Sequence, residues 1–425
     1  MTTTTRPTPA PTPAARHARW AVFALFFTNG ALFANIVPRY PEIKDVFALS
    51  DPVYGVTVAL FPLGAIVSGP FAARVIRRFS SARTAALGTV GIGVLLSLVG
   101  IVTLWRSATG GVDEGVGAVL LYALFCLLFF AAGAFDSITD VGQNAHGLRV
   151  QGLYGRPIFN SFHGGWSLGA VTGGLMGSAA VALHIPLEWH LIGAAAIFIA
   201  VGLLAQRYAL PGPDDAETAR ETPGEGEDGD LRVHTRPFRV GLLLTLLTLL
   251  AISGMLAEDA TSTWSALYMR DYLGVEAGQV GLAYVVMLGS QAVGRLSADR
   301  VTARVGAWRT AQGGGLLMVL GMGVAVAWPS VGTTLAGMAL AGFGTASLVP
   351  VAMNAANDLP GLRPGSGLTI VTWLGRLAFL CAPPLVGLLV ESTSLLSAMA
   401  VIPAAGLVAV LVSLLLAPSR GTQVR

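Results

Sequence analysis

Long apolar segments recur along the whole chain, and they restrict its fold more than any other feature. A helix that crosses a bilayer needs about 20 mostly apolar residues. The sequence contains twelve such windows. They fall at about 20–38, 53–73, 84–105, 117–141, 158–183, 189–209, 238–268, 277–298, 308–328, 331–354, 366–390 and 394–417. This pattern predicts an all-α membrane protein with twelve transmembrane helices.

The composition agrees with this fold class. Hydrophobic residues make up 54% of the chain and charged residues only 12%, whereas about 25% of an average soluble domain is charged. The net charge of +3 comes from the loops, and no basic patch with interleaved aromatic residues indicates nucleic acid. Cys126 and Cys381 both lie in apolar windows, which argues against a disulfide or a metal site. We expect no metal, no cofactor and no nucleic-acid partner.

The basic residues predict the orientation in the membrane. An even number of spans puts both chain ends on one side, and cytoplasmic loops carry the excess of Lys and Arg. Of the 26 Lys and Arg residues, 21 fall on the side of the chain ends and Arg376 lies within a window. The remaining four are Arg39, Lys44, Arg106 and Arg270. We therefore expect a multi-pass protein of the cytoplasmic (plasma) membrane with both termini in the cytoplasm.

The windows divide into two groups of six. Between them, residues 210–237 contain the stretch "PGPDDAETARETPGEGEDGD", with eight acids, a composition typical of a solvated linker. The predicted units are therefore two six-helix halves, 20–209 and 238–417, joined by this acidic cytoplasmic linker. The Thr- and Pro-rich residues 1–19 are expected to form a disordered cytoplasmic tail, and residues 418–425 a second tail.

The two halves share a weak internal similarity. "DVGQNAH" at 140–146 aligns with "PVAMNAA" at 350–356, at an offset of 210 residues. Both stretches lie in the fourth window of their half. The offset is about half the chain, which favours a duplicated six-helix unit, and repeated halves around a central site are common in transporters. We expect the halves to be pseudo-symmetric.

These features resemble the major facilitator superfamily over residues 18 to 417. The passages "DVGQNAHGLRV", "GRPIFNSFHGGWSLGAVTGG", "LAEDATSTWSALYMRDYLG" and "APPLVGLL" resemble a bacterial branch near the fucose-permease group. The resemblance implies secondary transport and a central cavity lined by the first and fourth helices of each half. Monomers are usual in families of this kind, so a monomer in contact with membrane lipid is expected.

The superfamily's gating signature is unevenly kept. In the loop after the second window it has become "GPFAARVIRR", in which Ala73 replaces the acid while Arg74, Arg77 and Arg78 remain. The loop after the eighth window, "GRLSADRVTARVG", keeps it better. The resemblance therefore implies gating roles for Arg74, Arg77, Arg78, Asp299, Arg300 and Arg304, with the first loop in doubt.

Several polar residues share one face of the fourth window. Asp136, Asp140, Gln143 and Asn144 are spaced i, i+4, i+7 and i+8, and such a stripe must face a cavity or another helix. Asp136 is predicted to carry a proton during transport. For Asp140 two interpretations stay open: it also exchanges a proton, or it forms an ion pair with Arg74 or Arg77 that closes the inner gate.

The fifth and seventh windows carry further ionisable residues. His163 lies at a depth similar to the two aspartates, which allows a proton relay, although a lone His is as often a packing residue. Glu258 shares a face with Thr261 and Ser265 and is predicted to bind substrate or a proton, or else to form a structural ion pair. Asp259 faces about 100° away, towards the interface between the halves.

Arg376 lies deep in the eleventh window. Two uses stay open. It pairs with Glu258 or Asp259, or it binds a substrate carboxylate or phosphate through both arms of its guanidinium group. The second use would make the substrate an anion.

Uncharged candidates complete the predicted substrate site. Amides with Trp rings would suit a sugar-like polyol, although interfacial Trp is common in membrane proteins. The predicted substrate-binding residues are Asn29, Gln143, Asn144, Trp166, Trp264, Asn354, Trp373 and Arg376.

The sequence therefore predicts a proton-coupled secondary transporter, a symporter of a small polar solute such as a sugar or another metabolite. Proton-driven efflux of drugs or metabolites is the alternative. The first is preferred because the fifth window lacks the Gly-Pro pair usual in the antiporters that this chain resembles. No nucleotide-binding motif, nucleophile–base set or HExxH spacing is present, so we expect no catalytic residue and no enzyme.

Overall fold

The computed structural model describes residues 12–109, 115–154, 158–212, 237–357, 359, 362 and 366–416. In this part of the chain all regular elements are helices. The predicted tail at 1–11, the central 213–236 of the linker and residues 417–425 lie outside the described residues.

The described part of the first half contains six long helices and two short ones. Its elements are α1 (Pro13–Ile36), η1 (Val37–Arg39), α2 (Tyr40–Val46), α3 (Asp51–Phe79), α4 (Ser81–Ala108), α5 (Val116–Gly152), α6 (Phe159–Ala182) and α7 (Leu187–Arg207). The first helix begins earlier than predicted, because Thr12 accepts a hydrogen bond from the Ala15 amide and Pro13 starts the helix, a combination that favours a helix start. Residues 13–19, predicted as part of the disordered tail, are therefore helical.

The second half repeats this arrangement, with one helix broken. Its elements are α9 (Pro237–Leu267), η2 (Tyr268–Tyr272), η3 (Ala277–Gln279), α10 (Leu282–Val305), α11 (Ala307–Ala327), α12 (Val331–Thr345), α13 (Leu348–Asn357), α14 (Ser366–Ser392) and α15 (Leu395–Leu416). The window 331–354, predicted as one span, is interrupted at Ala346 and Ser347.

Eleven helical segments of the described chain are long and apolar enough to cross a membrane. Among the twelve predicted spans, α6 does not reach this hydropathy because it is rich in Gly and Ser. It packs closely against α1, where a side chain at Gly169 would overlap the carbonyl oxygen of Phe27. Small residues allow such close backbone approach between membrane helices, so the low hydropathy of α6 reflects its packing inside the bundle.

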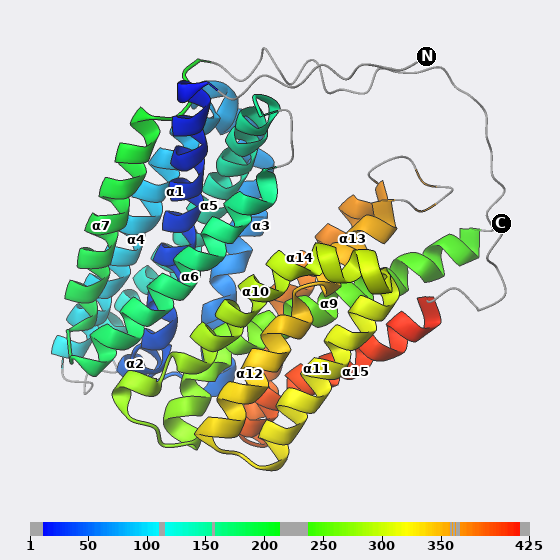
Figure 1. Ribbon diagram of the computed structural model, residues 1–425. Helices are drawn as coiled ribbons and strands as arrows, with labels where there is room; N and C mark the ends of the chain where they lie inside the picture. Colours follow the sequence, from blue (N-terminus) through cyan, green and yellow to red (C-terminus); the bar gives the residue numbers. More distant parts are fainter. Residues whose placement is uncertain are drawn as a thin grey trace, which may run out of the picture.

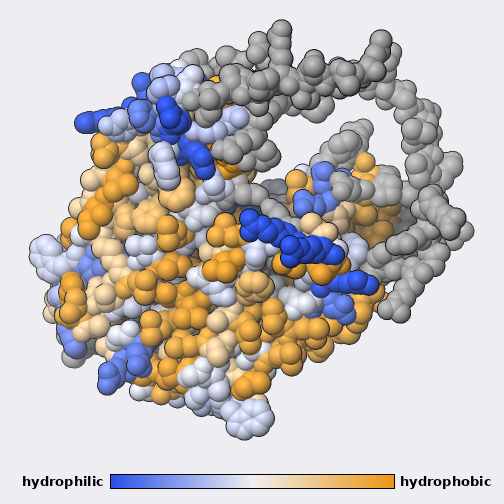
Figure 2. Space-filling model, viewed as in Figure 1, coloured by the Kyte–Doolittle hydropathy of each residue, from blue (hydrophilic) through white to orange (hydrophobic). Residues whose placement is uncertain are grey.

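The two halves meet along α3 with α14 and along α6 with α10. Figure 1 shows the helices of both halves close together at the lower edge and diverging upwards and to the right. We call the side on which α1 begins, α7 ends and α9 begins the linker face. In Figure 2, apolar side chains cover much of the visible surface, and hydrophilic ones gather at the upper end of the first half. This surface suits a lipid environment.

Candidate functional site

A cavity of about 330 Å³ lies between the two halves, within the usual range of about 300–1,000 Å³ for small-molecule sites. Helices of both halves contribute to its wall. Its polar and charged lining residues are Asp136, Ser137, Asp140, Glu258, Asp259, Ser262, Thr263 and Arg376. Its aromatic lining residues are Phe33, Tyr40, Phe61, Trp166, Tyr284 and Phe379.

A chain of hydrogen bonds holds the acidic wall of the first half. The indole nitrogen of Trp166 donates to Oδ1 of Asn29 at 2.9 Å, and Nδ2 of Asn29 donates to Oδ1 of Asp136 at 2.7 Å. One turn along α5, Asn144 donates to Oδ1 of Asp140 at 2.9 Å. The predicted residues Asp136, Asp140 and Trp166 therefore line the cavity, and the buried Asn29 joins Asp136 to Trp166 without lining it. Asn144 does not line the cavity itself, but it donates a hydrogen bond to Asp140, which does.

The acidic wall of the second half is built on α9. Nε2 of Gln291 donates to Oε2 of Glu258 at 3.0 Å, and Nη2 of Arg295 lies 3.7 Å from the same oxygen. Nη1 of Arg295 also donates to Oγ of Ser167 in α6, at 3.3 Å. Glu258 is therefore tied through Arg295 to a helix of the other half.

Asp259 lines the cavity together with its neighbour Glu258. Its side chain is only 2% exposed. The hydroxyl of Thr263 hydrogen-bonds the carboxyl group, but Oδ2 has no hydrogen-bond partner among the described residues. The phenol groups of Tyr40 and Tyr54 interact electrostatically with this carboxyl. A buried acceptor without a partner is unusual and calls for an explanation.

Arg376 brings a positive charge into this acidic cavity. It lines the cavity, and its charge acts on the carboxylate of Asp140. Within the described chain it forms no ion pair with Glu258 or Asp259, so the predicted pairing is absent in this conformation. The pairing of Asp140 with Arg74 or Arg77 is absent as well, since these arginines are exposed on the far end of α3.

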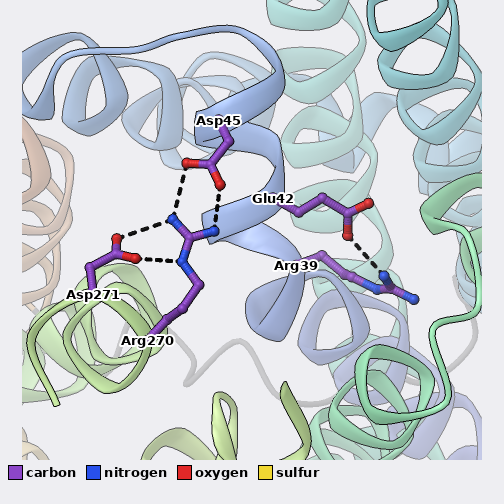
Figure 3. A network of polar contacts seen from close by, with 5 residues as sticks. All are labelled: Arg39, Glu42, Asp45, Arg270 and Asp271. Atoms are coloured by element: carbon purple, nitrogen blue, oxygen red, sulfur yellow. Dashed lines mark hydrogen bonds and ion pairs between the residues drawn. The ribbon is translucent and has the colours of Figure 1, made fainter. Parts of the chain in front are cut away.

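The halves are joined by polar contacts on the face opposite to the linker face. Nη1 and Nη2 of Arg270 donate to the two carboxylate oxygens of Asp45 at 2.6 and 3.0 Å, and Figure 3 shows the same guanidinium bound to Asp271. Arg270 lies in η2, a single turn of π-helix, a form often found at functional sites. Nearby, the hydroxyl of Tyr54 in α3 donates to the carbonyl oxygen of Thr263 in α9 at 2.6 Å.

Three predicted site residues pack elsewhere in the first half or its interface. Gln143 is buried and donates to the carbonyl oxygen of Leu25 at 2.9 Å, which joins α5 to α1. His163 lies edge-on between Phe26 and Phe159 and is not part of the cavity lining. Trp264 is fully buried. We therefore find packing roles for these three in this conformation.

Trp264 was predicted to bind substrate, but it does not line the cavity. Its ring packs edge-on against Tyr54 of the other half, with centroids 5.1 Å apart. Asn354 on α13 and Trp373 on α14 are exposed and do not line the cavity either.

The predicted gating residues lie at the linker face. Arg77 and Arg78 line a second cavity, of about 490 Å³, with Arg83 and Arg207. The guanidinium of Arg74 lies over the ring of Phe71, 5.6 Å from its centroid. Arg300 and Arg304 are exposed near the end of α10. The side chain of Asp299 lies outside the described residues.

Several cavity residues were missed by sequence reasoning. Tyr40 follows the first window and lies outside every predicted span, but η1 and α2 continue the helical path and bury it. Arg295 and Gln291 do not line the cavity but contact Glu258. They lie in the eighth window, where two polar side chains spaced i and i+4 could have indicated an inward face. Tyr284 and Phe379 carry no signal that separates them from ordinary core residues.

Two helical halves of membrane-spanning length around a central cavity define the architecture of a secondary transporter. The model of the Major Facilitator Superfamily matches residues 22–321 and 247–424. The chain belongs to this superfamily. It is a multi-pass membrane transporter and not an enzyme.

Curated bacterial relatives cover most of the chain. An uncharacterized transporter of Sinorhizobium fredii, y4wD, is 27% identical over 375 residues, which cover 88% of this chain and 91% of that protein. The membrane protein MosC of Rhizobium meliloti is 26% identical over 395 residues, covering 91% of this chain and 87% of the relative. Both similarities span nearly the whole chain and support a common fold for all of it.

Solved structures share the fold at low identity. A mutant of the nucleoside transporter NupG has a TM-score of 0.71 at 11% identity, covering 94% of this chain and 99% of that one. A bacterial metal transporter has a TM-score of 0.69 at 13% identity, covering 97% and 100%. Such similarity supports the architecture alone.

Proposed function

We propose that this chain moves a small solute across the cytoplasmic membrane by alternating access and that the movement is coupled to protons. One observation carries the proposal: four carboxyl groups, two from each half, line the cavity between the halves. Ionisable groups in membrane segments are costly and mark ion or substrate pathways. Asp136, Asp140, Glu258 and Asp259 are the groups that would take up and release protons.

The contact between Glu258, Arg295 and Ser167 supports alternating access around this site. It joins a proton-binding candidate on α9 to a helix of the other half. Protonation of Glu258 would remove its attraction to Arg295 and weaken this link between the halves. The proposed orientation has both termini in the cytoplasm, so the linker face is the inner one. Arg74, Arg77, Arg78, Asp299, Arg300 and Arg304 stay predicted gating residues there.

Two directions of coupling use the same carboxyl groups. Symport of a sugar-like solute was predicted from the sequence, together with a place near the fucose-permease group, which stays a prediction. The lining favours the second candidate, proton-driven efflux. A polyol needs many hydrogen-bond partners, but aromatic and aliphatic side chains form most of the wall. The hydroxyl of Ser262 already donates to the carbonyl of Asp259.

Reconstituted vesicles test the proposal. The purified chain is inserted into liposomes that contain a pH-sensitive dye, and solutes are added outside without a pH gradient. Entry with a proton acidifies the lumen, whereas entry in exchange for a proton makes it alkaline. Solute entry without a change of dye signal would show that the transport is not proton-coupled. Glu258→Gln should abolish the dye signal, and Glu276→Gln, at an exposed loop acid, is the matched control.

A further inference from the structure

The cavity has an excess of acidic side chains over basic ones. Four of its lining side chains are acids, namely Asp136, Asp140, Glu258 and Asp259. Among the lining residues that the structure describes, Arg376 is the single cation. Buried charges in proteins are usually paired. A solute that fits this cavity would therefore be expected to bring positive charge with it.

The four cavity acids differ in whether they have a cationic partner. Asp140 lies under the influence of Arg376, and Glu258 has Arg295 at 3.7 Å. Asp136 receives a hydrogen bond only from the neutral amide of Asn29, at 2.7 Å. Within the described chain, therefore, Asp136 and Asp259 lack a cationic partner, and they come from opposite halves.

Asp259 gives the second and independent indication of a ligand. Its side chain is 2% exposed, it lines the cavity, and its Oδ2 has no hydrogen-bond partner in the described part of the chain. An unpaired buried acceptor is expensive to keep. A donor that arrives with the solute would satisfy it. An ammonium group offers both the donor and the charge.

The rest of the wall suits the body of an organic cation. Tyr40, Trp166, Tyr284 and Phe379 present aromatic rings to the cavity from four different elements. A cation over the face of a Trp or Tyr ring is attracted by the ring quadrupole. These rings also cover apolar surface. A solute with an apolar or ring body and one ammonium group matches both features.

Two other solute classes fit less well. An anion would face one guanidinium group against four carboxyl groups. A neutral polyol would leave Oδ2 of Asp259 without charge compensation and would lie against a mostly apolar wall. Neither class explains why unpaired acids are kept on both sides of the cavity.

We propose that the solute is a small protonated organic amine, that its ammonium group binds Asp259, that Asp136 of the other half contributes a second acid to the same cavity, and that the apolar body of the solute lies among the aromatic rings. This inference rests on the proposed transport function and names its substrate class.

Matched probes test this in detergent with the full chain at pH 7.5. Each set shares one body with three end groups: tryptamine, tryptophol and indole-3-propionate; phenethylamine, phenethyl alcohol and 3-phenylpropionate. Binding to the folded state raises the thermal midpoint, and titration gives the affinity. We expect the amine to bind about tenfold more tightly than the alcohol, and the acid most weakly. Equal or tighter binding of the alcohol or acid, or no shift with any amine, overturns the proposal.

Variants locate the binding group. Asp259→Asn keeps the shape of the side chain and should reduce amine affinity about tenfold, with alcohol affinity unchanged. Asp136→Asn provides the same test from the other half if the first variant does not fold. Glu276→Gln removes an exposed acid far from the cavity and should change neither affinity. Amine binding that is unaffected by both cavity variants would contradict the assigned site.

The experiments distinguish a failure of the amine-site proposal from a failure of the proposed transport function. Amine binding in detergent without any pH-dependent flux in vesicles would support the amine site and contradict the proton coupling. Proton-coupled flux of a neutral or anionic solute, with no amine binding, would support the transport function and contradict the amine site.

Discussion

Arg270 of the second half and Asp45 of the first half are joined by two hydrogen bonds, of 2.6 and 3.0 Å, on the face opposite to the linker face (Figure 3). The contact is a bidentate pair between guanidinium and carboxylate, the geometry that gives Arg its strongest ion pairs. It spans the two halves at the edge where Figure 1 shows them close together. It therefore holds this face closed, and it must break when the cavity opens there.

The first prediction concerns this contact. Arg270→Gln should shift the population towards the conformation that is open on this face. The side chains are 30% and 62% exposed, so the expected effect is about 0.2–1 kcal/mol, or up to roughly fivefold in population. Spin labels at Leu183 and Trp328, in a chain without Cys126 and Cys381, would report longer distances.

Glu42→Gln is the control for this experiment. Glu42 pairs with Arg39 at 2.8 Å within the same half (Figure 3). Its removal also breaks a pair between an arginine and a carboxylate, although the Arg39 side chain is only 4% exposed, and it does not release one half from the other. Equal distance changes in both variants would show that the Arg270 pair does not act as a closure.

A second prediction concerns the bond between Asn29 and Asp136. Asn29→Ala should lower the thermal midpoint, because Asp136 loses a donor in a half-buried place and the loss of such a partner costs about 1–3 kcal/mol. In Asp136→Ala, which removes the acceptor, the added substitution Asn29→Ala should cost less. A double-mutant cycle measures this coupling. Strict additivity of the two changes would argue that the bond at 2.7 Å contributes nothing.

Glycine positions give a third prediction. Gly169→Ala should destabilise the folded chain by about 1–3 kcal/mol, since the new Cβ would overlap the carbonyl oxygen of Phe27 and α6 would have to move away from α1. Gly164→Ala is the matched control on the same helix, because nothing lies within 4 Å of its added Cβ. Thermal unfolding in detergent compares the two. Helix propensity alone would raise the midpoint of both variants, because Ala is the better helix former. A midpoint of Gly169→Ala that is not below that of Gly164→Ala would therefore contradict the packing explanation.

Much of the fold followed from the sequence because its signals are local. Apolar runs of membrane length located the helices, and the 3.6-residue period placed Asp136 and Asp140 on one face of α5. Both residues line the cavity, whereas Gln143 and Asn144 of the same predicted stripe do not. Helix ends were less certain. The cap at Thr12 extended α1. The break at Ala346 and Ser347 lies just before Pro350, whose ring and missing amide hydrogen disfavour a helical bond to residue 346, a signal that the prediction of one continuous span did not use.

The cavity wall could be predicted only in part, because it depends on which helices are neighbours. Trp264 was expected at the cavity but is covered by Tyr54 of the other half. Asp259 was expected at the interface between the halves, and the cavity itself extends to that interface. Such outcomes depend on long-range packing, which the periodicity of a single helix does not contain.

A fourth prediction separates the two uses that the sequence left open for Arg376. If the cavity binds an amine, Arg376→Gln removes a competing cation and should tighten amine binding by at least several-fold, because like charges repel strongly at an effective dielectric constant of about 20. Arg74→Gln, at an exposed arginine outside the cavity lining, should have no effect. Loss of binding for the matched acid probe, with amine binding unchanged, would instead assign Arg376 to anion recognition.

The last prediction concerns pH. An ammonium group and a proton compete for the same carboxylate, so amine binding should be strong while the cavity acids are charged and should weaken as the pH falls. One competing proton reduces the affinity by up to about tenfold per pH unit below the titration of the group. The titratable and charged groups around the ligand are Asp136, Asp140, Glu258, Asp259, Tyr40, Tyr284, Arg295 and Arg376.

The dissociation constant of tryptamine, measured from pH 8 to pH 5, tests this predicted pH dependence. The amine stays protonated over this range, so a change in affinity reports the protein groups. Asp259→Asn should flatten the curve, whereas Glu276→Gln should leave it as in the unmodified chain. Binding that tightens at low pH would fit a proton bound together with the solute, as in symport. In that case the carboxyl groups would bind only the proton, and the proposal that the amine is exchanged for a proton would be wrong.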